Sequence, residues 1–180
     1  STLLAALTRA RPKIADYPFT TIYPNLGVAW LDNREIVLAD IPGVIEGAHE
    51  GVGLGDRFLK HVERCASFLH LIDATAEDVV TPYKTIRKEL ELYKKDLLQK
   101  PEIVALNKCD SLSGDEIKAK TAALEKACGH EVFAISAVAK TGLTEALRAA
   151  AKYVVRNKKN EDTNVEIKEE PVKKPWSPLD

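Results

Sequence analysis

The 180-residue sequence lacks several features that would assign its class at once. It has no apolar run near the roughly 18 residues that cross a bilayer, and no signal-peptide pattern at its start. Its three cysteines show neither a CxxC nor a Cys/His metal spacing. Basic and acidic residues nearly balance, 26 against 27, so bulk charge does not indicate a nucleic-acid-binding chain. We therefore expect a cytoplasmic protein with ordinary thiols and no membrane span.

Alternating strand and helix patterns predict an α/β fold. Expected strands cover residues 26–31, 35–40, 67–73, 103–106 and 132–135, and expected helices cover residues 1–9, 53–64, 82–98, 114–128 and 142–155. Asp32 and Asn33 are a short hairpin signal between the first two strands. The later strands are nearly continuous apolar runs, which is typical of strands buried on both faces of a parallel sheet. His70 falls within one of them and is predicted to be a hydrogen-bonded core residue.

The chain divides into a domain and a tail. Residues 1–156 carry the strand and helix patterns and are predicted to form a mostly parallel sheet with helices on both faces. Residues 157–180 are charged, contain three prolines and have little aliphatic content. This composition predicts a flexible tail or linker.

The strand at 35–40 ends in a carboxylate that is followed by glycine-rich sequence. Asp40, Ile41, Pro42 and Gly43 form a DxxG pattern. The aspartate can hold a metal ion through water, and Gly43 can present its backbone N–H to a terminal phosphate. A simple turn after a strand explains the same four residues, so this pattern alone leaves both interpretations open.

The tetrapeptide after the strand at 103–106 is the most informative in the chain. It reads Asn107-Lys108-Cys109-Asp110, an NKxD pattern. A carboxylate can accept two N–H groups from one edge of guanine, which adenine cannot reproduce. Lys108 can lay its aliphatic stem along the base, Asn107 can tie neighbouring loops together, and Cys109 fills the free position. A polar turn is the alternative, but the place after a buried strand favours base binding.

A second loop follows the strand at 132–135 and contains Ser136, Ala137 and Val138. In open α/β sheets, ligands bind at the carboxyl ends of the strands. We expect this loop to lie beside the NKxD tetrapeptide and to support the same base through backbone N–H groups.

The first two residues of the sequence are consistent with a phosphate-binding site. Ser1 and Thr2 open a helix, as they would if a GxxxxGK[ST] loop preceded them directly. Ser1 would then be a hydroxyl ligand of Mg²⁺. A plain helix cap explains the same two residues.

Taken together, these patterns resemble the Obg family of bacterial ribosome-associated GTPases. The specific marks are RARPKIADYPFTTIYPNLGV at residues 9–28 and DIPGVIEGAHEGVGLGDRFLKHVER at residues 40–64. The resemblance covers residues 1–155 and implies the fold of a P-loop G domain that binds GTP or GDP with Mg²⁺.

The resemblance also implies roles for single residues. It assigns switch I to a run of five residues, Phe19, Thr20, Thr21, Ile22 and Tyr23. Thr21 would reach Mg²⁺ when the γ-phosphate is present. Asp40 would hold Mg²⁺ through water, and Gly43 would sense the γ-phosphate.

The implied activity is slow GTP hydrolysis by a molecular switch. Val44 follows Gly43 where related enzymes carry a glutamine that positions the attacking water, and an apolar side chain cannot do this. Glu46, Glu50 or an outside partner are the open alternatives for the missing polar group. The resemblance further implies a role in assembly of the large ribosomal subunit, and we expect a monomer.

One departure from the family keeps alternatives open. The first strand and the GxPNxGKS loop that precede Ser1 in the family are absent from this sequence. We expect either the remainder of a longer chain or a fragment that binds nucleotide weakly. A non-enzymatic alternative is a module that contacts ribosomal RNA or protein through its switch segments and through Arg9, Arg11 and Lys13. Adenine specificity is a third alternative, against which Asp110 argues.

Overall fold

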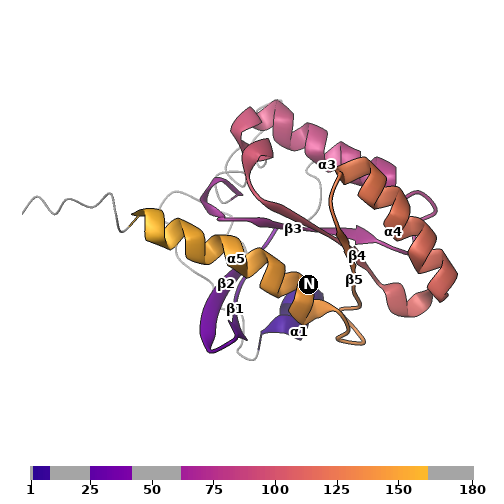
Figure 1. Cartoon of the computed structure of the whole chain (residues 1–180), viewed down its shortest axis with the longest axis horizontal. Coiled ribbons are helices and arrows are strands. Elements are labelled where there is room, and N and C mark those ends of the chain that lie inside the picture. Colours follow the sequence, from indigo (N-terminus) through magenta and orange to yellow (C-terminus); the bar gives the residue numbers. More distant parts are fainter. Residues whose placement is uncertain (1, 9–24, 42–61, 162–180) are drawn as a thin grey trace, which may run out of the picture.

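The computed structural model describes residues 2–8, 25–41 and 62–161, with side chains as far as residue 154. In chain order, the elements are α1 (Thr2–Leu7), β1 (Asn25–Leu31), β2 (Arg34–Asp40), β3 (Phe68–Asp73), α3 (Val80–Tyr93), the 3-10 helix η2 (Lys95–Gln99), β4 (Glu102–Asn107), the 3-10 turn η3 (Cys109–Ser111), α4 (Gly114–Cys128), β5 (Val132–Ala134) and α5 (Leu143–Glu161) (Figure 1). The predicted α/β fold is confirmed.

The strands β3, β4 and β5 form a parallel sheet with β4 in the centre. All four residues from Ile103 to Leu106 are buried, as the apolar run predicts. In register, Asp73 lies opposite Asn107 at the carboxyl ends of β3 and β4. This places the ends of three neighbouring strands, and the loops that follow them, at one edge of the sheet.

Helices cover both faces of this sheet because alternate side chains of β4 point to opposite sides. Val104 and Leu106 belong to a core cluster with Leu124 of α4, whereas Ala105 belongs to another with Ala146 of α5. Figure 1 shows α3 and α4 together on one side of the sheet and α5 on the other, toward α1 and the β1–β2 hairpin.

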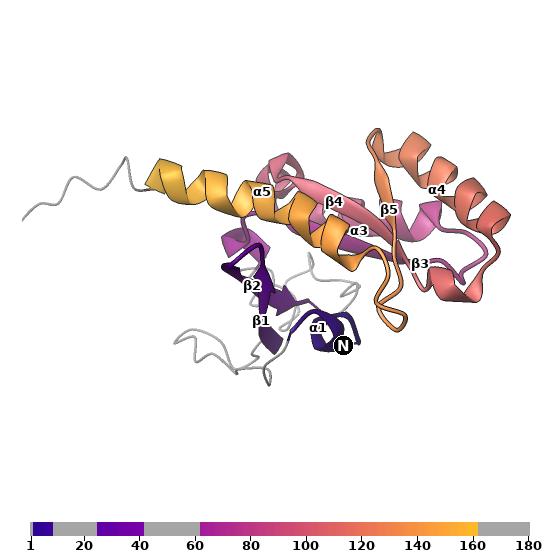
Figure 2. The ribbon, with the colours of Figure 1, turned by 60° about the horizontal axis from the view of Figure 1, so that its bottom comes forward.

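The strands β1 and β2 form the predicted antiparallel hairpin. Its turn residues Asp32 and Asn33 have φ values of 48° and 62°, as the two central residues of a type I′ turn require. Leu147 of α5 joins the core cluster of the hairpin, and Arg148 donates two 3.0 Å hydrogen bonds to the carboxylate of Asp32. Helix α5 therefore links the hairpin to the parallel sheet (Figure 2).

The described strands form two separate ladders. Within the described ranges, β2 is hydrogen-bonded only to β1, and β3 only to β4.

Helices α3 and α5 end several residues away from their predicted ends. Helix α3 ends at Tyr93 rather than at residue 98, since Lys94 is extended (φ −161°, ψ 115°) and the 3-10 helix η2 follows. The break buries Leu97, which is 1% exposed. Helix α5 continues to Glu161 and so includes the first five residues of the predicted tail, because no glycine or proline interrupts it there.

His70 is a hydrogen-bonded core residue, as predicted. Its Nδ1 lies 2.8 Å from Oε1 of Glu102, and both side chains are 6% exposed. The other carboxylate oxygen of Glu102 accepts a hydrogen bond from Arg87 at 3.1 Å and a longer one from Tyr83 at 3.4 Å. Burial of Glu102 alone would raise the pKa of its carboxyl. The hydrogen bond and charge of His70, together with the charge of Arg87, outweigh this effect, so the pKa of Glu102 is lowered. This network joins α3 to the start of the sheet.

Candidate functional site

Three loops meet at the carboxyl edge of the parallel sheet. They are residues 73–78 at the end of β3, residues 107–110 at the end of β4, and residues 136–138 after β5. We call them the 73–78, 107–110 and 136–138 loops. The second and third carry the predicted base-binding residues, and the structure brings these together.

Asn107 ties the three loops to one another. Its side-chain Oδ1 accepts a 3.1 Å hydrogen bond from the N–H of Ala137, and its backbone oxygen accepts a 2.8 Å bond from the N–H of Ala74. This confirms the interpretation of Asn107 as a residue that joins neighbouring loops. The N–H of Ala137, expected to support a base, is used by Asn107 in this structure.

Asp110 is held by Ser136. The hydroxyl of Ser136 donates a 2.5 Å hydrogen bond to Oδ1 of Asp110, and the same oxygen of Ser136 accepts a 2.9 Å bond from the N–H of Ala139. Ser136 is completely buried and its backbone pairs with Thr141, whereas Asp110 is exposed. A rigid, buried hydroxyl therefore orients an accessible carboxylate, which can accept two N–H groups from a ligand.

Lys108 reaches back to the neighbouring strand. Its backbone is left-handed (φ 67°, ψ 31°), which turns the chain out of β4. Its Nζ lies 2.6 Å from Oδ2 of Asp73, the last residue of β3. Thr75 donates to the other carboxylate oxygen of Asp73 from its backbone N–H at 2.9 Å and from its hydroxyl at 2.7 Å.

These contacts stabilise the ionised form of Asp73. Desolvation raises the pKa of its carboxyl, but the hydrogen bonds from Lys108 and Thr75 outweigh this and lower the pKa to about 2. Asp73 is the site residue that sequence reasoning missed. The sequence shows that Asp73 is a polar residue at the end of an apolar strand, but not that this strand lies beside the NKxD strand.

Cys109 has a structural position in the 107–110 loop. The thiol is buried and donates a 3.1 Å hydrogen bond to the carbonyl of Leu106, and its N–H donates to the carbonyl of Ile135. Burial raises the pKa of this thiol. A buried thiol with a raised pKa is a poor nucleophile. Val138, by contrast, is 73% exposed at the rim of the site.

The predicted phosphate and metal residues are described only in part. Thr2 is the first residue of α1, Asp40 ends β2, and Ile41 follows Asp40. Eight of the predicted site residues lie outside the described ranges: Ser1, Phe19, Thr20, Thr21, Ile22, Tyr23, Pro42 and Gly43. Asp40 is thus the one predicted Mg²⁺ ligand within them. Its carboxylate, at the end of a strand, is the kind of oxygen donor that Mg²⁺ prefers.

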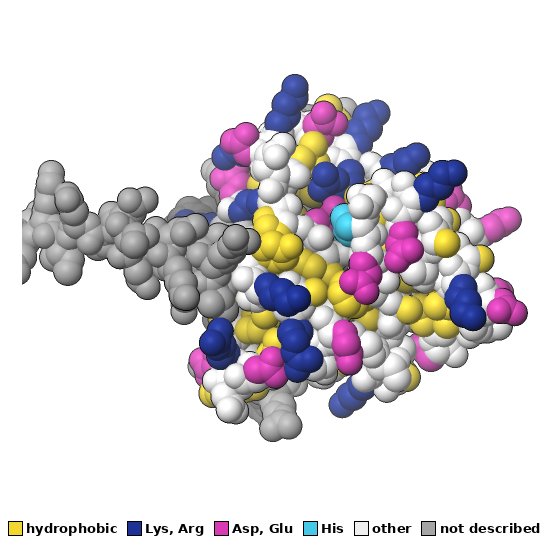
Figure 3. Space-filling view, in the orientation of Figure 1, with side chains coloured by type: hydrophobic (Ala, Val, Ile, Leu, Met, Phe, Trp, Pro, Cys, Tyr) yellow, Lys and Arg dark blue, Asp and Glu magenta, His cyan; other side chains and the backbone are white. Residues whose placement is uncertain are grey.

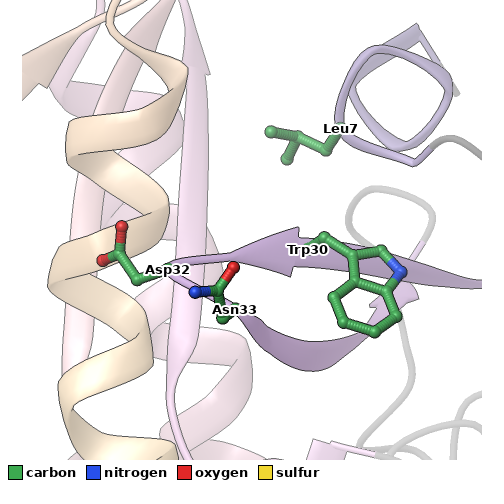
Figure 4. A pocket seen from close by; sticks show the side chains of 4 residues that line it. All are labelled: Leu7, Trp30, Asp32 and Asn33. Carbon is green, nitrogen blue, oxygen red and sulfur yellow. The ribbon is translucent and has the colours of Figure 1, made fainter.

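A hollow of about 350 Å³ lies away from this edge of the sheet, between α1 and the hairpin. It is lined by Leu7, Trp30, Asp32 and Asn33 (Figure 4). Both carboxylate oxygens of Asp32 are bound by Arg148. None of the predicted site residues lines this hollow, so we do not place the chemistry there.

The sequence of residues 1–108 matches the family described as 50S ribosome-binding GTPase. The chain belongs to this family of GTPases. Its α/β fold, with the parallel sheet and covering helices, is that of the G domains of P-loop GTPases.

Solved structures of GTPases share this fold. One is Era in complex with MgGDPNP and nucleotides 1506–1542 of 16S ribosomal RNA, with 25% identity and a TM-score of 0.64 over 85% of this chain and 52% of that chain. Another is the G domain of the T. maritima FeoB iron transporter, with 20% identity and a TM-score of 0.60 over 85% of this chain and 89% of that chain. A mutant of S. thermophilus NFeoB bound to GDP has 22% identity and a TM-score of 0.60 over 84% of this chain and 57% of that chain. The chain therefore spans little more than half of the Era and NFeoB chains.

No helix in the described ranges combines the length and the apolar character needed to span a bilayer.

Proposed function

We propose that this GTPase-family chain is a guanine-nucleotide switch of the Obg type that binds its base at the 107–110 and 136–138 loops. The observation that carries the proposal is the 2.5 Å hydrogen bond by which buried Ser136 orients exposed Asp110. A carboxylate held in this way is suited to a ligand edge that offers two adjacent N–H donors.

Guanine offers such an edge through its ring N–H and its amino group, and adenine does not. The carboxylate of Asp110 accepts both donors, and the aliphatic stem of Lys108 covers one face of the ring. Hydrogen bonds to a charged group contribute about 1.5–3 kcal/mol, which corresponds to roughly 10- to 150-fold in affinity. Asp110 therefore accounts for base selectivity.

The phosphate end of the site is proposed from sequence resemblance. Ser1, Thr21 and Asp40 would hold Mg²⁺, Gly43 would contact the γ-phosphate, and residues 19–23 would be switch I. Bound Mg²⁺ neutralises charge on the phosphate oxygens. Val44 has no polar group to orient an attacking water, so intrinsic hydrolysis is slow.

The same resemblance supports a role at the ribosome. The family is described as binding the 50S subunit, and we propose that the nucleotide state controls docking during assembly of the large subunit. The protein would then act in the cytoplasm as a monomer. In the face shown in Figure 3, basic and acidic side chains are interspersed, so a broad positive surface does not drive binding there.

An RNA- or ribosome-interaction module that does not hydrolyse GTP is the alternative. It predicts RNA binding whose affinity and salt dependence are the same with and without nucleotide. A switch predicts that GDP and a non-hydrolysable GTP analogue change this binding to different extents.

The proposal is tested by titrating the natural full-length protein with fluorescent GDP and fluorescent ADP, with and without Mg²⁺. The expected result is saturable binding of GDP, weakened by removing Mg²⁺, with ADP at least about 10-fold weaker. Equal binding of the two nucleotides, or none by a folded protein, would contradict it. Single-turnover hydrolysis of bound GTP then measures the expected slow rate.

A further inference from the structure

The ion pair between Lys108 and Asp73 joins two neighbouring strand ends at the base site. Lys108 adopts a left-handed backbone conformation, which is uncommon for a residue with a Cβ. This conformation allows its Nζ to reach Asp73, 35 residues earlier in the chain, at 2.6 Å. The ammonium end of a long flexible side chain is therefore anchored.

The carboxylate that anchors it is itself fixed. Both donors of Thr75 bind Oδ1 of Asp73, which leaves Oδ2 facing Lys108. One carboxylate oxygen is thus used for local structure and the other for the lysine. With its pKa near 2, the group is ionised throughout the neutral range.

The 73–78 loop is also hydrogen-bonded to α4 and to the end of β4. Nζ of Lys120 in α4 donates to the carbonyls of Ala74 at 2.6 Å and Ala76 at 2.7 Å. The N–H of Ala74 donates to the backbone oxygen of Asn107. One hydrogen bond therefore joins the loop that begins at Asp73 to the 107–110 loop, and two join it to α4.

We propose that Asp73 is a positioning residue of the base site: by holding Nζ of Lys108, it lays the lysine stem as an apolar support for one face of the bound purine. The inference rests on the proposed function, because it needs a base at this site. A lysine stem is long and has about four free torsions, so an anchored end reduces the freedom that is lost when the base binds. Asp73 therefore affects the dissociation rate of the nucleotide, whereas Asp110 determines which base binds.

The test compares dissociation rates of fluorescent GDP from the natural full-length protein and its variants. Asp73→Asn keeps an oxygen acceptor for Thr75 and removes the charge that faces Lys108. We expect GDP to dissociate about 3- to 5-fold faster from this variant, because a partly exposed ion pair contributes about this factor to an equilibrium or rate constant. Selectivity for GDP over inosine diphosphate should stay at the wild-type ratio, because Asp110 is unchanged.

A double-mutant cycle separates positioning from general damage. Lys108→Met keeps an aliphatic stem but loses the ammonium, so Asp73→Asn should have no further effect on the dissociation rate in that background. The matched control is Asp78→Asn in the same loop. Asp78 accepts hydrogen bonds from the N–H groups of Val80 and Thr81 at the start of α3, and its variant should release GDP at the wild-type rate.

The outcomes are distinct. Wild-type protein that binds no guanine nucleotide would overturn the proposed function and the inference with it. Wild-type binding with an unchanged rate in Asp73→Asn would overturn the inference alone. Equal acceleration by Asp73→Asn with and without Lys108→Met would also overturn it, since the effect would not pass through the lysine.

Discussion

Ser136 and Asp110 are joined by a 2.5 Å hydrogen bond although they lie 26 residues apart in the chain. Ser136 is completely buried and Asp110 is exposed. The buried partner is fixed by its backbone pairing with Thr141 and by the N–H of Ala139. The orientation of the carboxylate is therefore set by the core before any ligand arrives.

Removing this hydroxyl should weaken nucleotide binding. Ser136→Ala leaves Asp110 without its fixed donor, and we expect the Kd for GDP to rise about 10- to 100-fold, as for loss of a hydrogen bond to a charged group. Ser113→Ala is the control. Ser113 is the N-cap of α4 in a capping box with Glu116, so its loss should lower stability by about 1 kcal/mol and leave the Kd unchanged. Equal Kd values for Ser136→Ala and wild type would contradict the role of the hydroxyl.

Gly142 should be intolerant of a side chain. Its φ is +68°, and an added Cβ would lie within 2.4 Å of the carbonyl oxygen of Ala134. Gly142→Ala should therefore cost about 2 kcal/mol or more in the free energy of unfolding, measured by urea denaturation. Gly114→Ala is the matched control, because nothing lies within 4 Å of its added Cβ. The control should change stability by less than about 1 kcal/mol, and equal losses would refute the packing argument.

Glu102 should be important for stability rather than for binding. It is the shared acceptor of His70, Arg87 and Tyr83 at the opposite end of the sheet from the site. Glu102→Ala leaves buried His70 without its partner, and we expect a loss of about 3 kcal/mol in urea denaturation. Glu91→Ala, an exposed residue of α3, should stay within about 0.5 kcal/mol of wild type. A loss below about 1 kcal/mol for Glu102→Ala would show that the network contributes little.

Asp73 should add a pH-dependent part to the stability. Its pKa is lowered from 3.8 to about 2 on folding, so the unfolded state binds more protons between these values. The stabilisation is present above about pH 4 and is lost as the pH falls toward 2. Melting curves of wild type and Asp73→Asn should show a constant difference in Tm above about pH 5 that shrinks below pH 4. A difference independent of pH would mean that Asp73 is not stabilised in its ionised form.

Helices and turns were predicted correctly where characteristic residues mark their ends in the sequence. Helix α4 has the predicted bounds because Ser113 and Gly129 mark its two ends. The hairpin was predictable from Asp32 and Asn33, which tolerate the left-handed conformation that the turn needs. The end of α3 was not predictable in this way, because no glycine or proline marks the break at Lys94, after which Leu97 is buried.

The sequence predicted that the 107–110 and 136–138 loops lie side by side, but not every side-chain contact between the strand ends. The NKxD pattern located Asn107, Lys108 and Asp110, and the position of the second loop indicated Ser136. The partner of Lys108 was missed because Asp73 belongs to a different strand, and only the parallel register of β3 and β4 brings the two strand ends together. Such a pairing depends on tertiary structure and has no local signature.

The most direct test of the central claim exchanges the hydrogen-bonding character of Asp110. In Asp110→Asn, the amide offers a donor where the carboxylate accepted, so it matches xanthine, which carries a carbonyl oxygen in place of the amino group of guanine. Competition between GDP and xanthosine diphosphate should show that wild type prefers GDP by about 10-fold or more and that the variant prefers xanthosine diphosphate. A variant that keeps the wild-type preference for GDP would contradict base recognition by Asp110.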